Sequence, residues 1–218
     1  NVNSCQFYGP TTPAGTAYLL NGVSPNYSIQ HNVSKCFFAQ NNADIFLGDF
    51  WQGFTISQFN MTNGNVGLFV NSGATGILSQ INMTDGQINQ LTNQVVITSA
   101  VSNVIIKGVT FYVPANGTGL LMSATSDFNV ISNQFIAVGG TLTGRQGIDM
   151  SGGVANTVGV IEGNLFRNLV NGINLQATSL NTNVQSNAYN GNTNNVVNAG
   201  AGNTIGGGNA VGSFPHIA

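Results

Sequence analysis

Charge is the scarcest property of this 218-residue chain. Only 5% of its residues are charged, four basic and six acidic, whereas ordinary soluble domains carry roughly 25%. Binding to nucleic acid needs a patch of Lys and Arg that neutralises phosphates, and four basic residues cannot build one. We therefore expect no nucleic-acid partner. Solubility must come from uncharged polar groups, mainly Asn, Gly, Ser, Thr and Gln.

Long apolar runs and cysteines are also scarce. No apolar stretch reaches the roughly eighteen residues that a membrane helix needs, so we predict no membrane span. The first ten residues have neither a basic start nor an apolar segment, and no signal peptide is visible. The two cysteines, Cys5 and Cys36, are too few for a disulfide framework or a common zinc site. We expect no bound metal and no cofactor.

A repeated seven-residue pattern is the main positive feature. Asn and Gly form helices poorly, while Val, Ile, Phe and Thr favour strands, so the composition indicates β-structure. The clearest copies are residues 1–7 (NVNSCQF), 32–38 (NVSKCFF), 129–135 (NVISNQF) and 183–189 (NVQSNAY). Weaker copies are residues 53–59, 75–81, 105–111 and 160–166, and the copies begin about 26 residues apart on average.

A second short apolar strand follows most copies, as in residues 67–70 (GLFV), 119–122 (GLLM) and 172–175 (GINL). Short alternating strands joined by Gly- and Asn-rich turns form one coil per repeat, and coils stacked about 4.8 Å apart pair as parallel sheets. The sequence thus predicts an all-β parallel β-helix of about eight coils over residues 1–202, with one continuous core. Residues 203–218 lose the pattern, and we expect a terminal cap or exit segment there.

The way the chain begins suggests that it is part of a larger protein. Its first residues already lie inside a coil, with no capping helix ahead of Asn1. An uncapped solenoid end exposes unpaired strand edges. We therefore expect a fragment of a longer polypeptide.

Alternation within the seven-residue pattern predicts which side chains face the core. The second and seventh positions should point inward, and the fifth should form a further stacked column: Cys5, Cys36, Ser57, Ser79, Val109, Asn133, Asn164 and Asn187. The three consecutive Asn predict an internal amide ladder between coils. Cys5 and Cys36 become stacked neighbours, either within disulfide reach or simply two thiols used as small core residues.

Two outward columns suggest contact surfaces. The third and sixth positions are rich in amides, which suits hydrogen bonding to sugar hydroxyls and equally suits solubility alone. The second strand carries an outward column that begins apolar: Phe69, Val96, Leu121, Asp149, Asn174 and Val197. An apolar outward column marks a contact surface. We expect a homotrimer to cover it; an inserted loop or a partner domain are the alternatives.

The charged residues suggest where a substrate would bind. The turns over residues 8–16, 82–93 and 136–146 look long, and long loops on one edge of a solenoid form the walls of binding faces. Beside them we expect Lys107, Asp127, Arg145 and Arg167 to contact substrate. Trp51, the only tryptophan, is a sugar platform or a core residue.

Catalysis, if present, would need a pair of acids. Glycoside hydrolysis uses two carboxylates that flank the scissile bond, and Asp149 with Glu162 is the pair to test, against the alternative that both are structural or solvated. A polysaccharide lyase would instead draw on Lys107, Arg145, Arg167 and Tyr112. His31 and His216 have no Cys, Ser or acid partner at motif spacing, so we predict structural roles for both.

The NVxSNxF heptads, the GIxL strands and the Asn column resemble the right-handed parallel β-helix repeats of pectate-lyase-like enzymes and bacteriophage tailspikes, over residues 1–203. The clustered aspartates and the Gly-His-Gly segment of pectinase-type members are absent. The resemblance therefore implies a homotrimeric tailspike on a virion tail, outside the cell, which binds or depolymerises a bacterial surface polysaccharide and carries its carboxylates at outward strand positions. The alternative is a non-enzymatic adhesin or stalk at a cell surface.

Overall fold

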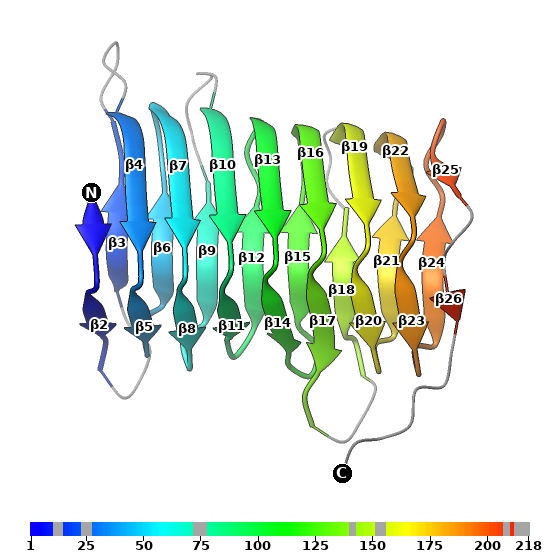
Figure 1. The fold of residues 1–218 in the computed structure, drawn as a ribbon, viewed down its shortest axis with the longest axis horizontal. Helices are drawn as coiled ribbons and strands as arrows, with labels where there is room; N and C mark the ends of the chain where they lie inside the picture. Colours follow the sequence, from blue (N-terminus) through cyan, green and yellow to red (C-terminus); the bar gives the residue numbers. More distant parts are fainter. Residues whose placement is uncertain are drawn as a thin grey trace.

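Parallel strands stacked into one elongated solenoid make up the molecule (Figure 1). The computed structural model describes residues 1–10, 15–22, 28–71, 78–139, 143–150, 156–206 and 210–211, and these residues contain strands and no helix. Three sheets of nine, nine and eight strands wind through about seven turns, close to the eight coils expected. The all-β solenoid is confirmed, and its right-handedness stays a prediction.

Each complete coil gives one strand to each sheet, and strands pair in parallel with their counterparts in the adjacent coils. Sheet A contains β1 (Val2–Asn3), β4 (Ser28–Ser34), β7 (Trp51–Ser57), β10 (Leu78–Thr84), β13 (Val101–Lys107), β16 (Thr125–Ile131), β19 (Asn156–Glu162), β22 (Ser179–Gln185) and β25 (Thr204–Ile205). Sheet B contains β2 (Gln6–Tyr8), β5 (Phe37–Ala39), β8 (Asn60–Thr62), β11 (Gln87–Asn89), β14 (Thr110–Val113), β17 (Gln134–Ala137), β20 (Leu165–Arg167), β23 (Ala188–Asn190) and β26 (Ala210–Val211). Sheet C contains β3 (Thr16–Leu20), β6 (Ala43–Leu47), β9 (Val66–Val70), β12 (Asn93–Ile97), β15 (Thr118–Met122), β18 (Gln146–Asp149), β21 (Asn171–Leu175) and β24 (Asn194–Asn198).

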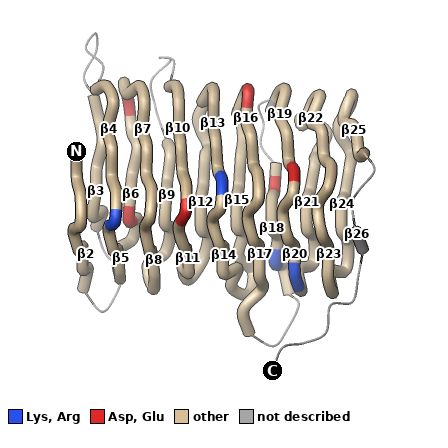
Figure 2. The backbone as a smooth tube through the Cα atoms, in the orientation of Figure 1, with Lys and Arg blue, Asp and Glu red and all other residues tan. Residues whose placement is uncertain are grey.

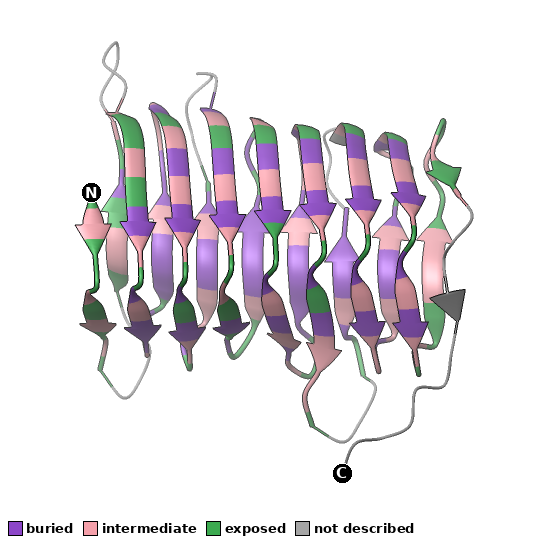
Figure 3. Cartoon of the chain, in the orientation of Figure 1, coloured by how far each residue is buried: buried purple, intermediate pink, exposed green. Residues whose placement is uncertain are grey.

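Aromatic rings stacked along sheet B form the densest part of the core. The ring centroids of Phe111 and Phe135 lie 4.5 Å apart, and those of Phe135 and Phe166 lie 4.9 Å apart. Glycines of sheet C leave room for these rings: a Cβ on Gly147 would lie 2.7 Å from the ring of Phe166. Along the strands of sheet A, buried residues alternate with more exposed ones (Figure 3). The predicted inward direction of the seventh heptad position is confirmed for these three residues.

The predicted register of two weak repeats is wrong. Pairing of β8 with β5 and of β11 with β8 aligns Phe38 with Met61 and Met61 with Ile88, so the true repeats there begin at Thr55 and Asn82. Residues 53–59 and 75–81 are therefore displaced, and residues 72–77 lie outside the described part. The segment 82–93, expected to be a long turn, contains the end of β10 and all of β11.

A sharp turn joins each strand of sheet A from β1 to β22 to the next strand of sheet B. The residue at this turn has a positive φ, between 52° and 67°, in eight successive coils: Ser4, Lys35, Gln58, Asp85, Gly108, Ser132, Gly163 and Ser186. Polar residues and glycine tolerate this left-handed conformation better than β-branched ones do. The turn directs the next side chain inward, where Asn133, Asn164 and Asn187 form the predicted amide ladder.

The end of the described chain continues the stack. β25 and β26 extend sheets A and B by one strand each, and they fall within the segment expected to be a cap or exit. The rest of that segment, including His216, lies outside the described residues.

Candidate functional site

Charged residues are spread over the solenoid instead of being gathered at one place (Figure 2). Lys107, Asp127 and Glu162 belong to strands of sheet A, whereas Asp149 belongs to sheet C and Arg167 to sheet B. Along sheet A, Ile131 stands between Lys107 and Glu162 in the same column, so they are two coils or about 10 Å apart. The structure does not bring the predicted substrate-binding set together.

The two proposed catalytic carboxylates lie in different sheets. Asp149 ends β18 and is buried, and its Oδ1 accepts a hydrogen bond of 3.0 Å from Nδ2 of Asn174. Glu162 ends β19 and is half-buried. Both occupy outward columns, but those columns run along separate faces of the solenoid. Nothing in this arrangement places the two carboxylates on either side of one bond.

Arg145 and Trp51 are committed to the interior. The guanidinium of Arg145 is almost fully buried and donates to the carbonyl oxygens of Gly139 and Val138, at 3.0 and 2.7 Å. The ring of Trp51 is fully buried, and its Nε1 donates to the carbonyl of Gly48 at 3.1 Å. Trp51 offers no face on which a sugar could stack, so the structure agrees with the core alternative.

His31 does have a serine partner, three residues earlier. Oγ of Ser28 lies 2.6 Å from Nε2 of His31, and the Tyr18 hydroxyl lies 3.0 Å from Nδ1. The sequence showed no such partner at motif spacing, and the fold supplies Ser28 from the same strand. Its register neighbour Phe54 is a core residue, so the imidazole lies in an inward column, and burial lowers its pKa. Both ring nitrogens are engaged, as a structural role requires.

A continuous hollow follows the corner between sheets A and B. Two adjoining cavities of about 510 and 360 Å³ share Phe59 and Asn60, and together we name them the corner groove. Its lining residues come from five successive coils: Ser4, Cys5, Gln6, Lys35, Cys36, Phe37, Gln58, Phe59, Asn60, Asp85, Gly86, Gln87, Gly108 and Thr110. A groove along the axis suits an extended polymer better than a compact ligand.

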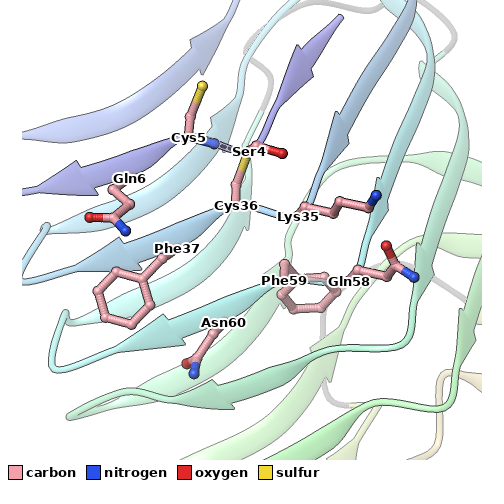
Figure 4. A pocket seen from close by; sticks show the side chains of 9 residues that line it. All are labelled: Ser4, Cys5, Gln6, Lys35, Cys36, Phe37, Gln58, Phe59 and Asn60. Carbon is pink, nitrogen blue, oxygen red and sulfur yellow. Dashed lines mark hydrogen bonds between the residues drawn. The ribbon is translucent and has the colours of Figure 1, made fainter.

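Figure 4 shows the two walls at the N-terminal end of the corner groove. The side chains of Lys35 and Gln58 extend to one side of the corner, and those of Phe37 and Asn60 extend to the other. The walls thus combine an ammonium group, amides and one partly exposed aromatic ring. This set offers donors, acceptors and an apolar face to a polyhydroxylated ligand.

A second hollow follows the middle of sheet A. The third residue of each long strand has a positive φ, as at Gln30, Gln80 and Asp127, so the strands bend there. Two cavities of about 200 and 390 Å³ lie along this bend. Exposed Gln, Asn and Asp side chains line them together with apolar residues such as the exposed Val158, and we name the two cavities the strand groove.

One buried carboxylate lies away from both grooves. Asp44 is fully buried, and its Oδ1 accepts a hydrogen bond of 2.9 Å from Nδ2 of Asn41. Its Oδ2 accepts from Nε2 of Gln90, and Oε1 of Gln94 accepts from the backbone N–H of Gln90 at 2.9 Å. Desolvation raises the pKa of Asp44 to about 7, against the partial compensation of these hydrogen bonds. Asp44 is a structural carboxylate with a titration near neutral pH.

Both cysteines lie among the described residues. Cys5 and Cys36 are both free, and Cys36 is buried as a core residue. Within the described ranges, no three His, Cys, Asp or Glu side chains cluster in a way that could hold a metal ion. No helix that could cross a membrane occurs in the part of the chain that the structure describes.

Comparison of the chain with protein-family models, with curated proteins and with solved structures finds no match. The fold therefore rests on the repeat and the strand pairing, and function must be argued from the surface of the solenoid itself.

Sequence reasoning missed the corner groove because of the displaced repeats. The fifth-position column was assigned Ser57 and Ser79, whereas the true register gives Phe59 and Gly86. The signal was present in the preceding turn residues, since Lys35, Gln58 and Asp85 repeat the polar, positive-φ position found in the strong copies. An alignment on those turn residues places Phe59 and Gly86 in the column that Asn133, Asn164 and Asn187 occupy in later coils.

Proposed function

We propose that this solenoid binds a bacterial surface polysaccharide along its axis, outside the cell, in the manner of a tailspike-type receptor-binding protein. The observation that carries the proposal is the pair of grooves that run across successive coils and combine amide and carboxylate side chains with apolar ones. Amides both donate and accept hydrogen bonds, as sugar hydroxyls do. Coils repeat about every 4.8 Å, so the grooves present these groups at regular intervals to a polymer.

A homotrimer packed through sheet C completes the proposal. The outward column of that sheet is apolar over five successive coils, at Leu19, Phe46, Phe69, Val96 and Leu121. The rings of Phe46 and Phe69 meet edge to face with centroids 5.4 Å apart. Leu19 is exposed and Phe46, Phe69 and Leu121 are half-buried, whereas Val96 is already buried. The exposed part of this column is costly to leave in water, and three copies around an axis would cover it.

Binding is better supported than cleavage. A glycosidase holds its two carboxylates about 5 to 10 Å apart across one bond. Asp149 and Glu162 lie in different sheets, and Asp149 is buried against Asn174. We therefore place recognition first and keep depolymerisation by this pair as the hypothesis to be tested second.

The test is incubation of the purified protein with a panel of bacterial surface polysaccharides, with bound polymer and released oligosaccharides both measured. Retained polymer without release is the expected result. Release that disappears in the folded double variant Asp149→Asn, Glu162→Gln would establish the depolymerase. Absence of both binding and release would overturn the proposal and favour a stalk whose coils only span distance.

A further inference from the structure

Three backbone N–H groups in the corner groove lack hydrogen-bond partners among the described residues. They belong to Cys36, Phe59 and Gly86, which follow one another in successive coils. Their carbonyl groups are all paired, with the N–H groups of Asn60, Gln87 and Thr110. At these three residues only the backbone donors are unpaired, and the backbone acceptors are not.

Later coils show what normally pairs with this N–H group. The N–H of Val109 donates to Oδ1 of Asn133 at 2.9 Å, and that of Asn133 donates to Oδ1 of Asn164 at 2.9 Å. In each case the acceptor is the fifth-position side chain of the following coil. Even the first coil has a weak substitute, since the N–H of Cys5 lies 3.4 Å from Sγ of Cys36.

The three unpaired donors arise because the following coil supplies no acceptor. The residues that follow Cys36, Phe59 and Gly86 in the column are Phe59, Gly86 and Val109, and none of these three has a side-chain acceptor. The Phe59 ring also occupies the space beside Gly86, where a Cβ would lie 2.3 Å from it. Unpaired N–H groups are costly when removed from water, so an acceptor from outside the chain is favoured here.

The walls indicate the chemistry of that acceptor. Lys35 is exposed on the ridge of the groove beside the first unpaired donor and adds a positive charge with three further donors. Asp85 lies two coils along the same ridge and can only accept when ionised. One end of the groove therefore favours an anionic, acceptor-rich group, and the other end favours hydroxyl donors.

We propose that the corner groove binds a carboxylate-bearing sugar of the polysaccharide. Its carboxylate pairs with the Lys35 ammonium and accepts from the N–H groups of Cys36 and Phe59. A hydroxyl oxygen of the same sugar accepts from the N–H of Gly86, while the other hydroxyls and the next sugar face Asn60 and Asp85. This inference rests on the proposed function and names the substrate class. The ligand is an acidic glycan that lies along the axis.

Backbone amide chemical shifts test the site directly, with D-glucuronate, D-glucose and acetate as probes of the isotope-labelled protein. Glucuronate is expected to shift the amide resonances of Cys36, Phe59 and Gly86 saturably, with glucose weaker. Unmoved resonances at these three residues would overturn the inference. Equal shifts with acetate would reduce it to adventitious anion binding and would also overturn it.

Two substitutions separate the charge from the donors. Lys35→Gln keeps a residue type that the turn accepts at Gln58, and should weaken glucuronate binding roughly fivefold while glucose binding is unchanged. Val109→Asn extends the amide ladder by one coil and gives the Gly86 N–H an internal acceptor. The Gly86 resonance should then stop responding to glucuronate, whereas the control Val109→Ala should respond as the parent does. A Gly86 response that survives Val109→Asn would contradict the assignment.

The same variants distinguish this inference from the broader proposal. If the polysaccharide panel identifies a bound polymer and Lys35→Gln leaves its affinity unchanged, the corner groove is wrong while the proposed function stands. If no polymer binds but glucuronate shifts the three amides, the groove stands and polysaccharide recognition falls.

Discussion

Oδ1 of Asn164 accepts two hydrogen bonds from Asn133, one from its backbone N–H at 2.9 Å and one from its Nδ2 at 3.0 Å. Nδ2 of Asn164 in turn donates to the carbonyl of Val130 at 2.9 Å. The side chain of Asn164 is buried, so each of these groups would otherwise be unpaired away from water. The ladder thereby fixes the corner between sheets A and B in the later coils.

Removal of one ladder amide should destabilise the solenoid. Asn164→Ala leaves two donors of Asn133 and one backbone carbonyl short of a partner, at a cost of about 2 to 4 kcal/mol. Denaturant unfolding measures the change. The control Asn194→Ala removes an exposed amide that contacts Asn171 and should cost under about 0.5 kcal/mol. Equal losses in the two variants would contradict the role assigned to the ladder.

The glycine column of sheet C should be intolerant of any side chain. In Gly147→Ala the added methyl group would lie 2.5 Å from the carbonyl oxygen of Gly172 and 2.7 Å from the Phe166 ring. We expect a loss of about 1 to 3 kcal/mol, because neither neighbour can move freely. Gly163→Ser is the matched control, since Ser132 and Ser186 occupy the same turn in neighbouring coils. A lower unfolding temperature for Gly163→Ser than for Gly147→Ala would contradict this packing.

Stability should fall as pH rises through the titration of Asp44. The pKa of this carboxyl is raised from 3.8 to about 7 in the fold, so the folded state holds the proton more tightly than the unfolded state does. Its favourable contribution is complete below about pH 4 and is lost progressively toward pH 7, by on the order of 3 to 4 kcal/mol at most.

Unfolding measured between pH 4 and pH 8 tests this slope. Asp44→Asn should flatten it, whereas Asp127→Asn, which alters an exposed carboxylate, should leave it as in the parent. Identical slopes in all three proteins would show that Asp44 does not carry the pH dependence.

Association should depend on the apolar column of sheet C. Phe69→Gln places an amide in the middle of that column, where Phe69 is half-buried in the single chain, so folding should persist while trimers dissociate. Sedimentation or light scattering measures the oligomer. Leu91→Gln changes an exposed apolar residue outside the column and should leave association intact. A monomeric parent protein would remove the homotrimer from the proposal.

The amino-acid sequence alone determined the class of fold and much of the core. Scarce charge, poor helix formers and a repeated heptad led to a parallel solenoid, and three stacked Asn led to the ladder that the structure confirms. These features are local or strictly repeated, so they can be recognised before any coil is placed beside another. Where the repeat was strong, the inward residues followed from alternation.

Register, burial and the neighbours of each charge were decided only by tertiary structure. Phe54 and Ile56 both face inward, since residues two apart on a strand point to the same side. Alternation alone therefore could not tell which of them occupies the second position of the repeat. Strand pairing assigns Ile56 to it, opposite Val33. That choice put Phe59 and Gly86 into the corner and left three N–H groups unpaired there. The winding of the coil likewise sent Asp149 and Glu162 to different sheets and enclosed Asp44, since distances between coils are set by stacking and not by separation along the chain.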